Sequence, residues 1–130
     1  MNAPSNLKYA ESDEWIKVEG NTITIGITDY AQDQLSDIVF WESMVDVDEE
    51  VDADSVVSSL ESVKAAGDVN TPVAGRIIEL NGELDAAPEM VNSDPYGAAW
   101  MVKIEISDPA ALDALLDADA YTKFCEERSE

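Results

Sequence analysis

Two short runs of alternating apolar and polar residues near the start of the chain limit its fold most strongly. Residues 15–18 and 22–27 alternate in this way, and the sequence Glu-Gly-Asn at 19–21 separates them. Alternation with a period of two gives a strand one buried face, and a Gly-Asn pair is typical of a tight reversal. The sequence therefore predicts an antiparallel β-hairpin.

The remaining chain predicts further strands and a smaller number of helices. Strands are predicted at residues 37–41, 56–63, 73–80 and 101–106. Helices are predicted at residues 29–35, within 82–90 up to Pro88, at 109–116 and at 118–127. Residues 92–97 are rich in turn formers, and the acidic residues 42–54 predict a solvated loop. We expect a mainly β domain with short helices and a helical C-terminus.

Polar residues before the predicted helices identify their starts. Asp29 is the predicted cap of the helix at 29–35, because aspartate oxygens accept hydrogen bonds from free N–H groups. Ser107 or Asp108 is the predicted cap of the helix at 109–116. Pro109 then occupies the first helical position, where its missing N–H costs nothing.

The charge balance excludes several classes of partner. The chain of 130 residues is long enough for one domain, over residues 1–130. It has 29 Asp and Glu against seven Lys and Arg, which gives a net charge of −22. Nucleic acid and anionic membrane surfaces are therefore not expected as partners, because both require clustered Lys and Arg. The acidity fits a well-solvated surface, steering toward a basic partner, or a salt-rich cytoplasm.

Histidine is absent and Cys125 is the single cysteine. Ser-His-Asp and Cys-His catalytic groups and an internal disulfide are thereby excluded. Cys125 is predicted to be a partly buried helical thiol, because its acidic neighbours disfavour a reactive thiolate. Carboxylate pairs are uninformative in so acidic a chain, and residues 42–54 lack the offsets of a calcium loop. We therefore expect that the chain is not an enzyme and has no metal site.

The sequence also predicts a location. No apolar run reaches the length of a membrane span, and residues 1–4, Met-Asn-Ala-Pro, lack the features of a signal peptide. We expect a cytoplasmic protein of a bacterium. A protein of the mitochondrial matrix with its transit peptide removed is the alternative.

Lys64 stands out because it lies at a predicted hairpin tip. Residues 64–68, Lys-Ala-Ala-Gly-Asp, separate two β-rich runs, and the small residues leave room for an enzyme to enclose the lysine. An exposed tip lets a neighbouring protein reach the amine, and acylation there would remove its charge. From spacing alone, an ordinary surface lysine remains the alternative.

The segment around Lys64 resembles the lipoylation motif of glycine cleavage system H-proteins, and so do other parts of the chain. The motif is Glu-Ser-Val-Lys-Ala at residues 61–65. Blocks resembling the family occur in order at residues 8–10 with 14–15, 26–32 with 35–40, 62–75, 91–97 with Trp100, and 121–125. Together they cover residues 7–127.

The resemblance implies a fold and a carrier function. The fold is a barrel-sandwich hybrid of two small antiparallel sheets, as in lipoyl and biotinyl carriers. By this resemblance we expect lipoic acid to be joined as an amide to Lys64 by a lipoate ligase or lipoyl transferase. The arm accepts an aminomethyl group from glycine decarboxylase (P-protein) and presents it to the tetrahydrofolate-dependent aminomethyltransferase (T-protein). Dihydrolipoamide dehydrogenase (L-protein) reoxidises it.

The resemblance also implies site residues. The residues of the attachment motif are Glu61, Ser62, Val63, Ala65 and Gly67. The residues expected to line a cleft for the loaded arm are Ser12, Glu14 and Asp68. Two positions depart from the family pattern: Asp13 stands where histidine is common, which makes the entrance more acidic, and Ser36 replaces a frequent glycine.

Other carriers fit the sequence less well. Biotin carriers usually have methionine on both sides of the lysine, whereas Val63 and Ala65 flank Lys64. Lipoyl domains of 2-oxo acid dehydrogenases usually have aspartate before the lysine and lack C-terminal helices. Two alternatives remain open: an H-like protein that relays lipoate to other enzymes, and an unmodified acidic interaction protein.

Overall fold

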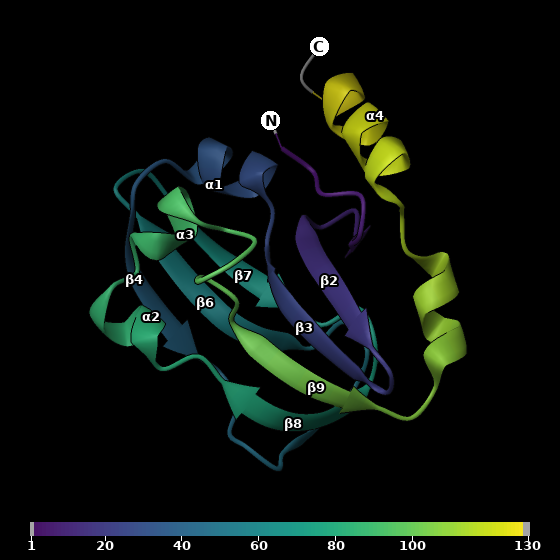
Figure 1. Ribbon diagram of the computed structural model, residues 1–130. Coiled ribbons are helices and arrows are strands. Elements are labelled where there is room, and N and C mark those ends of the chain that lie inside the picture. The colour runs from purple at the N-terminus through teal and green to yellow at the C-terminus, as the bar shows by residue number, and fades with distance from the viewer. Residues whose placement is uncertain (1, 129–130) are drawn as a thin grey trace.

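The computed structural model describes residues 2–128, which form two antiparallel sheets with short helices at their edges (Figure 1). The strands are β1 (Lys8–Tyr9), β2 (Glu14–Glu19), β3 (Thr22–Ile27), β4 (Ile38–Ser43), β5 (Glu50–Val51), β6 (Val56–Ser62), β7 (Ala66–Asn70), β8 (Gly75–Leu80) and β9 (Val102–Ile106). The helices are α1 (Asp29–Leu35), α2 (Glu83–Ala86), α3 (Met90–Ser93), the 3-10 helix η1 (Pro109–Ala114) and α4 (Ala118–Arg128). One sheet has six strands in the order β1-β2-β3-β9-β8-β5, and the other has three in the order β4-β6-β7.

The predicted N-terminal hairpin is confirmed. Strands β2 and β3 pair from Glu14 opposite Ile27 to Glu19 opposite Thr22, which leaves a two-residue turn. Gly20 opens this turn with a φ of 63°, a conformation that glycine adopts without steric cost. Strand β3 then pairs with β9, so a segment 80 residues later completes the centre of the sheet.

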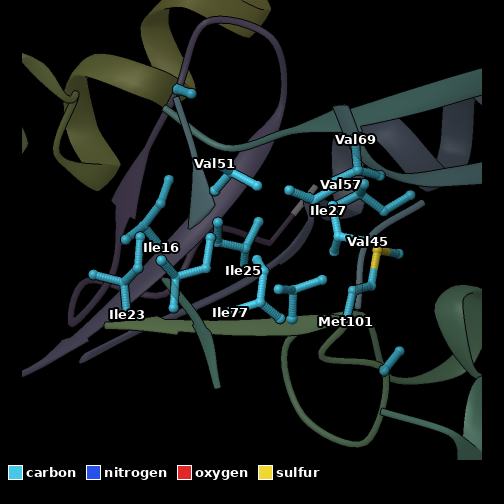
Figure 2. Close-up of a cluster of buried hydrophobic side chains, with 14 of the residues drawn as sticks. Ile16, Ile23, Ile25, Ile27, Val45, Val51, Val57, Val69, Ile77 and Met101 are labelled. Carbon is cyan, nitrogen blue, oxygen red and sulfur yellow. The ribbon is translucent and has the colours of Figure 1, made fainter. Parts of the chain in front are cut away.

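The core lies where the two sheets face each other. Ile16, Ile25 and Ile77 of the six-stranded sheet meet Val57 and Val69 of the three-stranded sheet, and all five are fully buried (Figure 2). Burying each such side chain contributes about 1.5–3 kcal/mol relative to leaving it exposed. The packing of these β-branched residues therefore fixes the two sheets against each other.

A second apolar cluster attaches α4 to the start of the chain. The rings of Tyr9 and Tyr121 stack with centroids 4.7 Å apart and planes within 9°. Tyr9 also exchanges two backbone hydrogen bonds of 2.8 Å with Leu116. Cys125 lies in the same cluster and is buried more completely than predicted. The C-terminal helix is thereby held beside β1 and β2 (Figure 1).

Several local predictions were wrong. The cap of α1 is Thr28, not Asp29, because Thr28 has extended backbone angles and its hydroxyl accepts a hydrogen bond from Ala31 N–H. Asp108 does cap the helix predicted at residues 109–116, but that segment is the 3-10 helix η1, which ends at Ala114. Asn92 and Ser93, predicted to be in a turn, end helix α3.

Two predicted loops contain strands. Residues 66–68, predicted to be part of the turn after Lys64, belong to β7, so the hairpin tip is shorter than expected. The acidic loop contains β5, which pairs with β8 and buries Val51. Both differences arise because strand pairing satisfies backbone groups whatever the local polarity of the side chains. None of the helices found between residues 2 and 128 is long and apolar enough to cross a membrane.

Ser36 occupies a backbone conformation that few residues other than glycine adopt. It ends α1 with φ of 68° and ψ of −155°, and its carbonyl accepts a hydrogen bond from the Asn92 side chain. Residues held in such regions cost about 1–3 kcal/mol. The position where the H-protein family frequently has glycine is therefore a strained one in this chain.

We predict that Ser36→Gly raises the free energy of unfolding by about 1 kcal/mol, because relief of strain exceeds the entropy that glycine adds to the unfolded chain. Ser36→Ala is the matched control, since alanine keeps the strain and should leave stability near the wild-type value. Urea denaturation of the three proteins tests this. A glycine variant no more stable than the alanine variant would contradict it.

Candidate functional site

A closed turn presents Lys64 between β6 and β7. The Ser62 hydroxyl accepts hydrogen bonds from the N–H groups of Lys64 (3.1 Å) and Ala65 (2.9 Å) and donates one to the Ala65 carbonyl (3.0 Å). The N–H of Val63 donates to the carbonyl of Asp37, which ties the tip to the strand beside it. The predicted exposed lysine at a hairpin tip is therefore present, on a turn with defined geometry.

The Lys64 side chain is exposed and lies at the end of α1. Its Nζ is 3.4 Å from the carbonyl oxygen of Gln34, near the C-terminal end of that helix. None of the ion pairs found within residues 2–128 involves Lys64, although the chain is strongly acidic. The amine is thus open to approach from solvent.

One cavity borders the lysine hairpin, and a second cavity lies next to the first. The first, of about 210 Å³, is lined by residues that include Gln34, Leu35 and Asp68. The second, of about 310 Å³, is lined by residues that include Glu14 and Asn70. Ser12 lines both cavities. We call these two cavities, which share Ser12 as a lining residue, the hollow.

Glu14 is a buried carboxyl in the second cavity. Only 2% of its surface is exposed, and it accepts hydrogen bonds from the Ser12 hydroxyl (2.5 Å) and the Asn70 N–H (3.2 Å). Burial disfavours the charged carboxylate and raises its pKa to about 7, although the two hydrogen bonds act in the opposite direction. Glu14 can therefore be either protonated or charged near neutral pH.

Of the three predicted cleft residues, the structure joins only Ser12 and Glu14 directly. Asp68 lies opposite Ser59 in the sheet, one position from the pair of the buried Leu60 and the half-buried Gly67, and it is exposed. Alternation along β7 turns its side chain to the outer face, and it borders the first cavity rather than the second. Asp68 and Glu14 thus occupy different parts of the hollow.

Asp13 is paired with the C-terminal helix, which the sequence did not predict. Both of its oxygens accept hydrogen bonds from Arg128, at 2.6 and 3.1 Å, and Tyr121 O–H donates to it at 2.8 Å. The guanidinium also lies over the rings of Tyr30 and Phe124. The expectation of a more acidic entrance must be corrected, because Arg128 offsets the charge of Asp13. No local pattern could pair residues 115 positions apart.

Among the described residues 2–128, no group of three or more cysteine, aspartate or glutamate side chains is placed to hold a metal ion. Asn70 is a further site residue that the sequence did not predict. It contributes a backbone donor to Glu14 and lines the second cavity.

Comparison with known proteins decides the family. A family model described as Glycine cleavage H-protein matches residues 7–128. The chain belongs to this family. The glycine cleavage system H protein of Staphylococcus haemolyticus is 51% identical over 127 residues, covering 98% of this chain and all of the relative. The mitochondrial H protein 2 of Arabidopsis thaliana is 48% identical over 122 residues, covering 94% of this chain and 78% of the relative.

A solved structure confirms the predicted fold. The crystal structure of an H protein from Mycobacterium marinum superposes with a TM-score of 0.81 at 29% identity, covering 98% of this chain and 99% of that one. The barrel-sandwich arrangement of two antiparallel sheets is thus confirmed. Membership in the H-protein family makes this chain a carrier component of the glycine cleavage system and not itself a catalyst.

We predict that Glu14→Gln changes how stability depends on pH. The pKa of Glu14 is about 7 in the folded chain, above its ordinary value of 4.5. Between these two values, the folded chain holds a proton that the unfolded chain releases. Wild-type stability should therefore fall as pH rises through this range, by at most about 3 kcal/mol from this group.

Glutamine stays neutral and can keep both partners, with its amide oxygen accepting from Asn70 N–H and its NH2 donating to the Ser12 hydroxyl oxygen, so the variant should lack this part of the pH dependence. It should differ least from the wild type below about pH 4.5 and exceed it most near about pH 8. Urea denaturation across that range measures the difference. Parallel curves for the two proteins would show that Glu14 ionises normally.

Proposed function

We propose that Lys64 carries lipoic acid as an amide and that the chain, acting as one domain, shuttles the reactive end between the enzymes of the glycine cleavage system. The observation that supports this most directly is the exposed amine of Lys64 on a closed turn beside two adjoining cavities. An ordinary surface lysine would need neither the turn nor the hollow. Lys64 also lies in the segment that resembles the family's attachment motif.

The residues present fit a lipoyl group. The first cavity combines the apolar side chains of Ile27, Leu35 and Leu60 with polar groups, which suits the apolar stem of an acylated lysine. In the second cavity, the buried Oδ1 of Asn70 has no hydrogen-bond partner within the described part of the chain. This unpaired acceptor stands near Glu14, where a donor on the end of the arm could reach both.

The bound group would supply the chemistry, a dithiolane that takes up the one-carbon unit of glycine and is later reoxidised. The chain's own residues would hold and shield its end. A cationic amine in the second cavity would favour the charged form of Glu14, so its proton would move to solvent as the amine entered. Ser12 would orient the Glu14 carboxylate, and Asp68 would contribute negative charge nearer the lysine.

The tether explains why a carrier suits this pathway. A reactive end that is covalently attached meets each docked enzyme at high effective concentration, with no release into solution. We infer that the partners are glycine decarboxylase, aminomethyltransferase and dihydrolipoamide dehydrogenase, with a lipoate ligase or lipoyl transferase for loading. The bacterial cytoplasm or the mitochondrial matrix is the proposed location.

We predict that Lys64→Arg folds normally and loses carrier activity completely, because arginine keeps the charge but cannot form the lipoyl amide. A substitution at an exposed position should change stability by less than about 0.5 kcal/mol. Coexpression with a lipoate ligase, peptide mass spectrometry and glycine decarboxylation with purified partners would measure both effects.

Lys103→Arg is the matched control. Lys103 lies within strand β9, with its amine over the ring of Trp100, and not at a hairpin tip. It should be lipoylated at Lys64 and fully active. Lipoate on Lys103 or Lys17 of the wild type, with none on Lys64, would refute the assignment. So would glycine decarboxylation supported by the Lys64→Arg protein.

A further inference from the structure

Three apolar side chains are exposed together beside the lysine hairpin. Val39, Phe40 and Val63 have exposed fractions of 55%, 45% and 69%. Strand pairing makes them neighbours, because Phe40 lies opposite Glu61 and the N–H of Val63 donates to Asp37, two residues before Val39. Apolar side chains that are exposed side by side are a candidate interaction site. We call these three residues the apolar patch.

A β-bulge creates the patch. Ile38 lies opposite Ser62 and Phe40 opposite Glu61, so Val39 is an extra residue in β4. Ile38 and Trp41 are buried, whereas both residues between them face solvent. A regular strand would alternate and bury one of the two. The bulge therefore turns two successive apolar side chains outward at the cost of a regular ladder.

The surroundings of the patch are acidic. Asp37, Glu42 and Glu61 are exposed next to it, and Asp68 lies further across the same outer face. Lys64 is the only Lys or Arg in residues 37–43 and 56–70. The partner that complements this surface has an apolar recess bordered by Lys and Arg.

We propose that the apolar patch is the docking surface for the enzyme that attaches lipoate to Lys64. This rests on the proposed lipoylation of that residue. The attaching enzyme must act on Nζ itself and so must contact the hairpin, whereas enzymes that use the loaded carrier act on the far end of a flexible arm. The patch adjoins the lysine through Val63 and lies on the outer face of the β4-β6-β7 sheet, away from the packed core.

The test is a double variant, Val39→Ser with Phe40→Ser, incubated unmodified with a lipoate ligase, lipoate and ATP. We expect kcat/KM for lipoylation to fall by at least about tenfold, mainly through KM, because both anchors are removed. The matched control is Met44→Ser with Val47→Ser. These side chains are exposed to similar extents, 53% and 50%, but lie beyond the other end of β4, and lipoylation should stay at the wild-type rate.

Two further measurements separate docking from other effects. Urea denaturation of both double variants should match the wild type, because the replaced side chains are exposed. The Val39→Ser/Phe40→Ser protein, fully loaded by prolonged incubation, should serve glycine decarboxylase at the wild-type rate. Ligation of the wild type should slow as salt rises, since salt screens the acidic rim.

The outcomes distinguish the two proposals. A wild-type chain that takes no lipoate on Lys64 overturns the proposed function and the docking inference with it. A wild type labelled at Lys64, with a patch variant labelled equally fast, overturns the docking inference alone. If the patch variant lost as much rate with glycine decarboxylase as with the ligase, the assignment to the attaching enzyme would be overturned, because the patch would then contact both enzymes.

Discussion

The pairing of β6 with strands on both sides is the constraint on which the site depends. β6 lies between β4 and β7, and after the bulge at Val57 its inner face carries Ser58 and Leu60, both buried against the core. Because side chains alternate along the strand, this burial fixes which residues face outward. A slip of one residue would bury Glu61 and expose Leu60. The core thereby determines the position of the Lys64 turn and the acidic outer face.

The sequence predicted the parts of the fold that follow from local pattern. The β2–β3 hairpin, the strand β9 and the lysine at a hairpin tip all arise from alternation and turn chemistry within a few residues. The resemblance to H-proteins supplied the sheet arrangement, which periodicity alone could not give. The errors lie where tertiary contacts outweigh local preference, as in β5, where pairing with β8 makes a strand inside an acidic loop.

The site divides in the same way. The position of Lys64 at a hairpin tip could be predicted because it depends on one short segment, whereas the hydrogen bonds of the Ser62 hydroxyl that close the turn were not predicted. The burial of Glu14 and its contact with Asn70 could not, because they join positions 56 residues apart. The same is true of the patch at Val39 and Phe40, since a bulge is a property of two strands and not of one. The burial and hydrogen bonds of the residues that line the hollow therefore follow only from the three-dimensional structure.

The contact between Asp13 and Arg128 has a consequence for how the protein tolerates proteolysis. Chain ends are usually trimmed without effect, because they are seldom tied to functional parts of a domain. Here the last turn of α4 reaches the residue between Ser12 and Glu14, with two hydrogen bonds to its carboxylate. A carboxypeptidase that removed Arg128 would leave the Asp13 carboxylate with the Tyr121 hydroxyl but without its charge partner, so the negative charge of Asp13, which raises the pKa of the buried Glu14, would no longer be offset. Trimming of α4 would thus change the electrostatics around Glu14 in the second cavity.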